Sequence, residues 1–138
     1  MQIGEYIFKR MSSGCPEEYA VYDKEDNRVG YVHLRRGVLY AQTPWRGGVD
    51  IYYAHVGNWF TGRFKSDKQR LMYLTRIAKR ISRSRFKVTC SECKCVTRMM
   101  LGDLNELDKT GKTIVTCRHC GGWITVRDDG NGLVAGRM

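Results

Sequence analysis

The chain has 138 residues, which is enough for one ordinary domain or two small ones. Its 24 lysines and arginines outweigh 14 aspartates and glutamates, and the net charge of +10 favours an anionic partner, most commonly nucleic acid. The sequence contains no apolar stretch of membrane-spanning length and no signal-peptide pattern at its start. Cys15 has no partner in a disulfide framework, which indicates a reducing interior. We therefore expect a cytoplasmic protein, or one that acts inside a host cell if it is viral, with no membrane partner.

The first part of the chain is predicted to be a β-sheet. It alternates runs of β-branched and aromatic residues with turn residues, a pattern typical of short antiparallel strands. We expect about five strands, at residues 5–11, 19–23, 29–35, 38–43 and 49–56. Arg36-Gly37 predicts a tight hairpin turn, because glycine supplies the positive φ that such a turn needs.

A helix is predicted over residues 66–84. Ser66 and Gln69 fit a capping box, in which both side chains accept hydrogen bonds from free backbone N–H groups. One face of the helix carries an apolar stripe made of Leu71, Leu74, Ile77, Ala78 and Ile81. This stripe would cover one face of the sheet. The predicted fold class of residues 1–85 is thus α+β, an antiparallel β-meander followed by one basic amphipathic helix.

The opposite face of this helix is predicted to be basic and to include Arg70. Residues 66–87 hold eight lysines and arginines but only one acid, Asp67, for a net charge of +7. Because no glutamate lies four residues from these cations, helical ion pairs do not neutralise them. A solvated helix face is the alternative, but an anionic partner would relieve the repulsion. The candidate phosphate-contacting residues are Arg76, Lys79, Arg80, Arg83, Arg85 and Lys87.

Two aromatic loops adjoin the predicted strands. The loop PWRGG places Trp45 beside Arg46, and the loop GNWFTG contains Trp59. An exposed tryptophan can stack on a nucleic-acid base, which contributes roughly 1–3 kcal/mol per base. Trp45 and Trp59 are therefore candidate stacking residues. The alternative is that these aromatics, like the tyrosines and histidines of the strands, pack in or at the edge of the sheet.

Two cysteine pairs form the most specific motif in the chain. Cys90 and Cys93 make one C-x2-C pair, Cys117 and Cys120 make another, and 23 residues separate them. Strand-like segments flank both pairs, so each pair would lie in a tight turn that presents two thiolates. Two such turns brought together supply the four sulfurs of a tetrahedral zinc site. A redox or disulfide role is the alternative.

With these pairs and their flanking strands, residues 86–127 resemble the zinc-ribbon family. The resemblance covers about a third of the chain, and none is found for residues 1–85. The resemblance implies one structural Zn²⁺ held by four thiolates. It also implies contact with nucleic acid or polymerase-type machinery, which is common among zinc ribbons. Cys95 departs from the pattern and is either an alternative ligand to Cys93 or a spare thiol. His119 is a further potential donor.

The sequence thus predicts an α+β domain over residues 1–85, a zinc ribbon over residues 86–127 and a loosely held C-terminal tail over residues 128–138. We expect a small accessory or regulatory protein that binds DNA or RNA. The alternative is a protein-binding adaptor or inhibitor of a nucleic-acid enzyme, for example a phage-type host-takeover or anti-defence factor. The chain has no carboxylate cluster, phosphate-binding glycine loop or deaminase motif, so we do not expect an enzyme.

Overall fold

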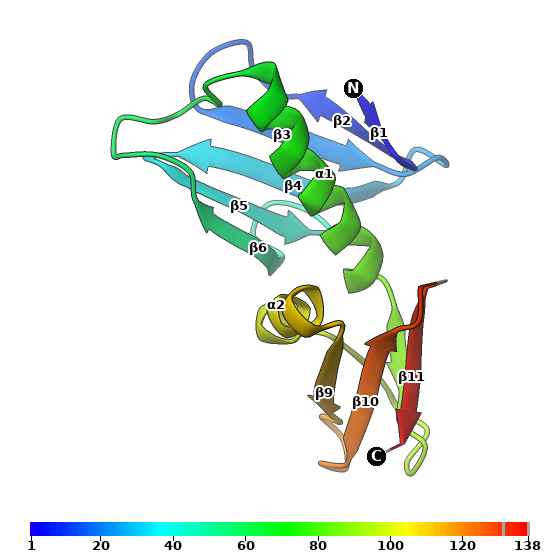
Figure 1. Cartoon of the computed structure of the whole chain (residues 1–138). Helices are drawn as coiled ribbons and strands as arrows, with labels where there is room; N and C mark the ends of the chain where they lie inside the picture. Colours follow the sequence, from blue (N-terminus) through cyan, green and yellow to red (C-terminus); the bar gives the residue numbers. More distant parts are fainter. Residues whose placement is uncertain (131, 138) are drawn as a thin grey trace. The chain divides into compact units, whose positions relative to one another are not determined.

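The structure, a computed structural model, describes residues 1–130 and 132–137 (Figure 1). It is a mixed α+β structure, as the sequence predicts, and it divides into two compact units, Met1–Ile81 and Ser82–Met138. Among the described residues, no helix is both long and apolar enough to cross a membrane.

Six antiparallel strands form a meander in the first unit, in the order β1-β2-β3-β4-β5-β6. They are β1 Gln2–Ile3, β2 Tyr6–Arg10, β3 Glu17–Tyr22, β4 Arg28–Arg35, β5 Val38–Thr43 and β6 Val49–His55. The five predicted strands correspond to β2 through β6. The additional strand β1 lies at the sheet edge and is too short to produce an alternating sequence pattern.

The hairpin between β4 and β5 turns at Arg36 and Gly37, as predicted. Both residues have positive φ, at 54° and 78°, and positive φ at both central residues is the geometry that matches the twist of paired strands. A Cβ atom on Gly37 would lie 2.4 Å from the backbone oxygens of Gly57 and Asn58. The Gly37 N–H donates to the carbonyl oxygen of Thr61 at 2.7 Å. Glycine therefore also lets the loop after β6 pack against this turn.

Helix α1, Asp67–Ser84, lies across one face of the six-stranded sheet (Figure 1). Its start is fixed by Ser66, whose Oγ accepts a hydrogen bond from the Gln69 N–H at 3.1 Å. The Gln69 side chain accepts from the N–H of Lys65, at 2.9 Å, and not from that of Ser66. The predicted capping box therefore forms with one of its two hydrogen bonds shifted by one residue.

The apolar stripe of α1 packs on the sheet. Its buried members are Leu74, Ile77, Ala78 and Ile81. Gly30 in β4 gives the helix room, because a Cβ atom there would lie 2.9 Å from Cδ1 of Ile81. Leu71 is 54% exposed, so its predicted place in the stripe is wrong. Arg70, the preceding residue, takes the inward position in this turn.

A buried ion pair joins α1 to the sheet. Glu17 in β3 is buried, and its carboxylate accepts hydrogen bonds from the Arg70 guanidinium at 2.6 and 3.1 Å. The Tyr19 hydroxyl, at 2.5 Å, and the Phe64 N–H, at 3.3 Å, donate to the same carboxylate. Arg70 also pairs with Asp67. Its predicted place on an unpaired basic face is therefore wrong.

The second unit contains a hairpin, a helix and a three-stranded sheet. The hairpin consists of β7 Lys87–Thr89 and β8 Val96–Arg98. Helix α2, Leu101–Thr110, follows it. The sheet has the order β11-β10-β9, with β9 Lys112–Thr116, β10 Trp123–Asp128 and β11 Leu133–Arg137. Helix α2 packs against β9 and β10 (Figure 1).

Helix α2 has no counterpart in the sequence prediction, which expects only strand-like segments beside the cysteine pairs. Met100 precedes the helix, and its N–H donates to the Asp103 carboxylate at 2.9 Å. Gly111, with a φ of 80°, ends the helix in the left-handed conformation that favours glycine. Only Leu104 and Leu107 are buried in α2, and two residues are too few to give a helical period in the sequence.

Residues 133–137 do not form the loosely held tail that the sequence predicts. They form β11, which pairs with β10 from Asp128↔Leu133 to Ile124↔Arg137. The prediction was wrong here because pairing with the preceding strand β10 in a hairpin, and not local propensity, makes this segment a strand. Residues 131 and 138, which belong to the same predicted tail, lie outside the described residues.

The Glu17 ion pair gives the first unit a specific dependence on pH. Burial raises the pKa of Glu17, but hydrogen bonds from Arg70, Tyr19 and Phe64 outweigh this effect, so the pKa is lowered from 4.5. Because the folded pKa is below the unfolded value, the stabilisation is complete above the unfolded pKa and is lost as the pH falls through the folded pKa.

We expect Glu17→Gln to destabilise the first unit by about 3–5 kcal/mol at neutral pH, because it leaves the Arg70 guanidinium without its buried carboxylate partner. The difference from the wild type should shrink as the pH falls below 4.5. Urea unfolding across a pH series measures both effects, with the exposed Glu25→Gln as a control. An equal loss of stability at every pH would contradict this role for Glu17.

Candidate metal centre and cationic surface

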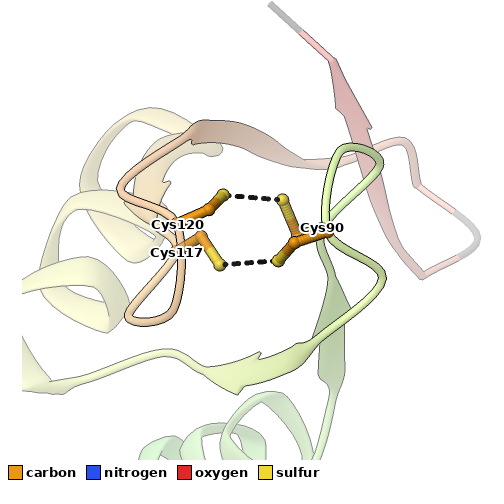
Figure 2. A group of neighbouring side chains, drawn as sticks. Cys90, Cys117 and Cys120 are labelled. Atoms are coloured by element: carbon orange, nitrogen blue, oxygen red, sulfur yellow. Dashed lines mark hydrogen bonds between the residues drawn. The ribbon is translucent and has the colours of Figure 1, made fainter.

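Four cysteine sulfurs converge in the second unit, from the turns after β7 and β9. The Sγ atoms of Cys90, Cys93, Cys117 and Cys120 all lie within 4.8 Å of one another. Cys90 Sγ is 3.6 Å from Cys120 Sγ (Figure 2). Cys93 Sγ is 3.6 Å from Cys117 Sγ. Four sulfurs at about 2.3 Å from a tetrahedral metal ion are about 3.8 Å apart. The cluster therefore has the donors and the spacing to hold one metal ion, such as zinc.

The two cysteine turns share one hydrogen-bond pattern. In the first turn, the Lys94 N–H donates to the carbonyl oxygen of Cys90 at 3.0 Å. In the second, the Gly121 N–H donates to the carbonyl oxygen of Cys117 at 2.9 Å. The Cys90 N–H donates to the carbonyl oxygen of Cys95 at 2.9 Å, and the Cys117 N–H donates to that of Gly122 at 2.7 Å. Lys94 and Gly121 both have positive φ. Residues 90–95 and 117–122 are therefore matching turns that present their sulfurs in the same way.

Backbone N–H groups in these turns point at the sulfurs. Those of Cys93 and Glu92 lower the pKa of Cys90. In the second turn, the backbone N–H groups of Cys120 and His119 lower the pKa of Cys117 to about 6. The Cys95 N–H lowers the pKa of Cys93, but burial and hydrogen bonds with the other sulfurs outweigh it and raise this pKa to about 12. Metal binding must therefore release protons from the cluster, because the thiolate is the form that binds metal.

Cys95 and His119 do not belong to the four-sulfur cluster found among the described residues. Cys95 has the place in the first turn that Gly122 has in the second, and its carbonyl oxygen accepts from the Cys90 N–H at 2.9 Å. His119 is exposed, and its backbone N–H contributes to the lowered pKa of Cys117. Both residues take part in the turns through their main chain.

Arg83 belongs to the second unit and contacts two acids of the same unit. Its guanidinium pairs with Asp108 in α2 at 2.5 Å and with Asp128 at the end of β10 at 2.7 Å. The residue is buried. A helical projection places Arg83 on the polar face of α1, but it cannot show that acids 25 and 45 residues away reach the same guanidinium. The predicted exposure of Arg83 to a phosphate is therefore wrong.

Arg80 is also an interior residue. Its guanidinium donates to the carbonyl oxygen of Ile51 in β6 at 2.7 Å and lies 5.3 Å from the ring centre of Tyr52. A long side chain can reach the sheet from the flank of a helix, so Arg80 is buried although it lies outside the apolar stripe. The predicted surface position of this residue is wrong. The candidate phosphate contacts that are exposed are Arg76, Lys79, Arg85 and Lys87.

Both candidate stacking residues lie in loops, as predicted. Trp45 is 59% exposed and Trp59 is 63% exposed. The Arg36 guanidinium lies 4.4 Å from the centre of the Trp59 ring, so a cation occupies one face of this indole. A third exposed tryptophan, Trp123 in β10, is not among the predicted site residues. The alternation of apolar and other residues along β10 could have shown that Trp123 lies on the face opposite the buried Ile124 and Val126.

The aromatic residues of β4 pack and do not form an open stacking platform. Tyr31 and His33 are buried. The Tyr31 hydroxyl donates to the Glu18 carboxylate at 2.5 Å, and His33 Nδ1 shares a hydrogen bond with the Tyr40 hydroxyl at 2.7 Å. Burial lowers the pKa of His33. These contacts agree with the packing alternative for Tyr31 and His33, whereas Tyr53 in β6 is 55% exposed.

Comparison with known proteins assigns the chain to no family. No protein-family model, no curated protein and no solved structure matches it. The cluster of four cysteines is compatible with the zinc ribbon that residues 86–127 resemble. The function of the site must therefore be inferred from its own residues.

Cys90 and Cys95, two of the three cysteines in the first turn, provide a matched test of the cluster. We expect Cys90→Ser to lose the bound metal and to unfold the second unit, because structural metal binding contributes about 10–16 kcal/mol in small zinc peptides. Cys95→Ser, the same change in the same turn, should keep one metal ion per chain. Metal analysis of the purified variants and thermal unfolding measure these effects. Loss of metal from Cys95→Ser but not from Cys90→Ser would contradict the ligand set.

Proposed function

We propose that the protein binds one zinc ion and uses its cationic surface to bind nucleic acid as a small accessory or regulatory factor. The observation that carries the proposal is the closed cluster of four cysteine sulfurs in the second unit. Soft thiolate ligands in a tetrahedral arrangement favour zinc. Four protein donors leave no position for a water molecule or a substrate, so the zinc is structural and residues 86–127 form a zinc ribbon into which α2 is inserted.

The zinc would supply folding energy that the second unit lacks. The unit is small, and its buried apolar residues include Val88, Leu104, Val115 and Val126. Such a unit usually needs a metal or a disulfide to fold stably. All six cysteines are free thiols. Since disulfides are rare in reducing compartments and zinc thiolates persist there, we place the protein in the cytoplasm.

The charge of the chain supports a polyanionic partner. The chain carries a net charge of +10, and Arg76, Lys79, Arg85 and Lys87 are exposed. Arg70, by contrast, is paired with acids and would not contact phosphates. Contacts through exposed cations are independent of base sequence and weaken with salt, because binding releases counterions from the nucleic acid.

A second candidate function is binding to a protein partner. Phe60 is 92% exposed and lies next to Trp59 in the loop after β6. Adjacent exposed aromatics are typical of the centre of a protein interface. The protein would then act as an adaptor or as an inhibitor of a nucleic-acid enzyme. Loss of partner binding on Phe60→Ala, without loss of nucleic-acid binding, would favour this function.

A salt series on labelled DNA and RNA tests the nucleic-acid proposal. We expect the affinity to fall steeply with salt, and we expect Lys79→Glu to reduce the slope of log K against log salt by about one or more. Lys24→Glu changes the net charge equally at an exposed turn of the first unit and should leave the slope unchanged. Equal effects of the two variants, or an affinity that does not depend on salt, would contradict a phosphate contact at α1.

A further inference from the structure

We infer that the second unit binds single-stranded nucleic acid on the open face of its three-stranded sheet, with Trp123 stacked on a base. This inference rests on the proposed function and assigns it a surface. The surface, called the Trp123 face, consists of Lys112, Ile114, Thr116, Trp123, Thr125, Arg127, Val134 and Gly136.

Strand register places these residues on one side of the sheet. Residues that are directly paired in antiparallel strands project to the same face. Three rows cross the strands: Thr116 with Trp123; Ile114 with Thr125 and Gly136; and Lys112 with Arg127 and Val134. The residues between them, Val115, Ile124 and Val126, are buried on the other face with α2. The Trp123 face is therefore the outer face of this sheet.

The Trp123 side chain is largely exposed. It is 65% exposed, and Ile114 in the next row is 47% exposed. Within the described part of the chain, no ring stacks on Trp123 and no cation lies over it, whereas the Arg36 guanidinium covers one face of Trp59. Exposed apolar side chains that adjoin one another on a rigid strand indicate a binding surface. The indole is thus available to stack on an incoming ring.

The charges on the Trp123 face favour a nucleic acid over a protein. Its two ionisable residues, Lys112 and Arg127, are both cations and lie side by side in the third row. The nearest acid in β10 is Asp128, which directly follows Arg127 and pairs with Arg83. An aromatic ring beside cations suits a base and its phosphates. A duplex does not offer a free base face, so the occupant is a single strand of DNA or RNA.

The metal centre would hold this surface in place. Trp123 directly follows Gly122, whose N–H donates to Cys120 Sγ at 3.4 Å. A Cβ atom on Gly122 would lie 3.3 Å from that sulfur, so the main chain approaches the cluster closely where β10 begins. Single-strand binding through Trp123 should therefore require the metal-loaded protein.

The test measures binding of the zinc-loaded full chain to labelled oligodeoxythymidylate, oligouridylate and a DNA duplex of equal length. We expect Trp123→Ala to weaken binding to the single strands roughly ten- to a hundredfold, with little effect on the duplex, and Trp123→Phe to retain most of the affinity. The two single strands show whether DNA or RNA is preferred. Val96→Ala, an exposed apolar residue in the hairpin of the same unit, is the matched control.

The outcomes separate this inference from the function on which it rests. If the wild type binds single strands in a salt-dependent way but Trp123→Ala binds equally well, the Trp123 face is not the site, and the proposed function stands. An equal loss for single strands and duplex also overturns stacking. If the wild type binds none of the three probes, both the inference and the nucleic-acid function are wrong. Zinc content of each variant shows that the fold is intact.

Discussion

The convergence of four sulfurs is the constraint on which the second unit depends. Two matching turns, 90–95 and 117–122, bring thiols to within 4.8 Å of one another, and thiols held this close are best satisfied by a metal ion. The turns close one hairpin from β7 to β8 and another from β9 to β10, so a metal ion at the cluster would join segments that share only a small apolar core. The start of β10, and with it Trp123, is fixed by the same turn.

Long arginine side chains connect the other elements and change what the surface can do. Arg70 joins α1 to β3 through Glu17, and Arg83 contacts both α2 and β10. These guanidinium groups raise the formal charge of the helix, but carboxylates neutralise them. The cationic surface that remains is smaller than the composition implies. A net charge of +10 therefore supports a polyanionic partner without identifying the residues that contact it.

The features that could be predicted from the sequence are those that depend on local patterns. Alternation gave β2 through β6, the glycine of Arg36-Gly37 gave a hairpin, and the C-x2-C spacing gave the four-cysteine cluster. Features that depend on distant residues could not be predicted. Helix α2 buries only two leucines, which pack against β9 and β10, and the acids that bind Arg83 lie far along the chain. The exposure of Trp123 likewise depends on which face of the sheet α2 covers.

X-ray absorption at the zinc edge of the purified protein tests the central claim most directly, because it reports the number, type and distance of the ligands. We expect one zinc ion per chain with four sulfur ligands at about 2.3 Å. A first shell that contains nitrogen or oxygen would contradict the assignment of Cys90, Cys93, Cys117 and Cys120. A protein purified under reducing conditions without zinc, but with a folded second unit, would contradict the structural role of the metal.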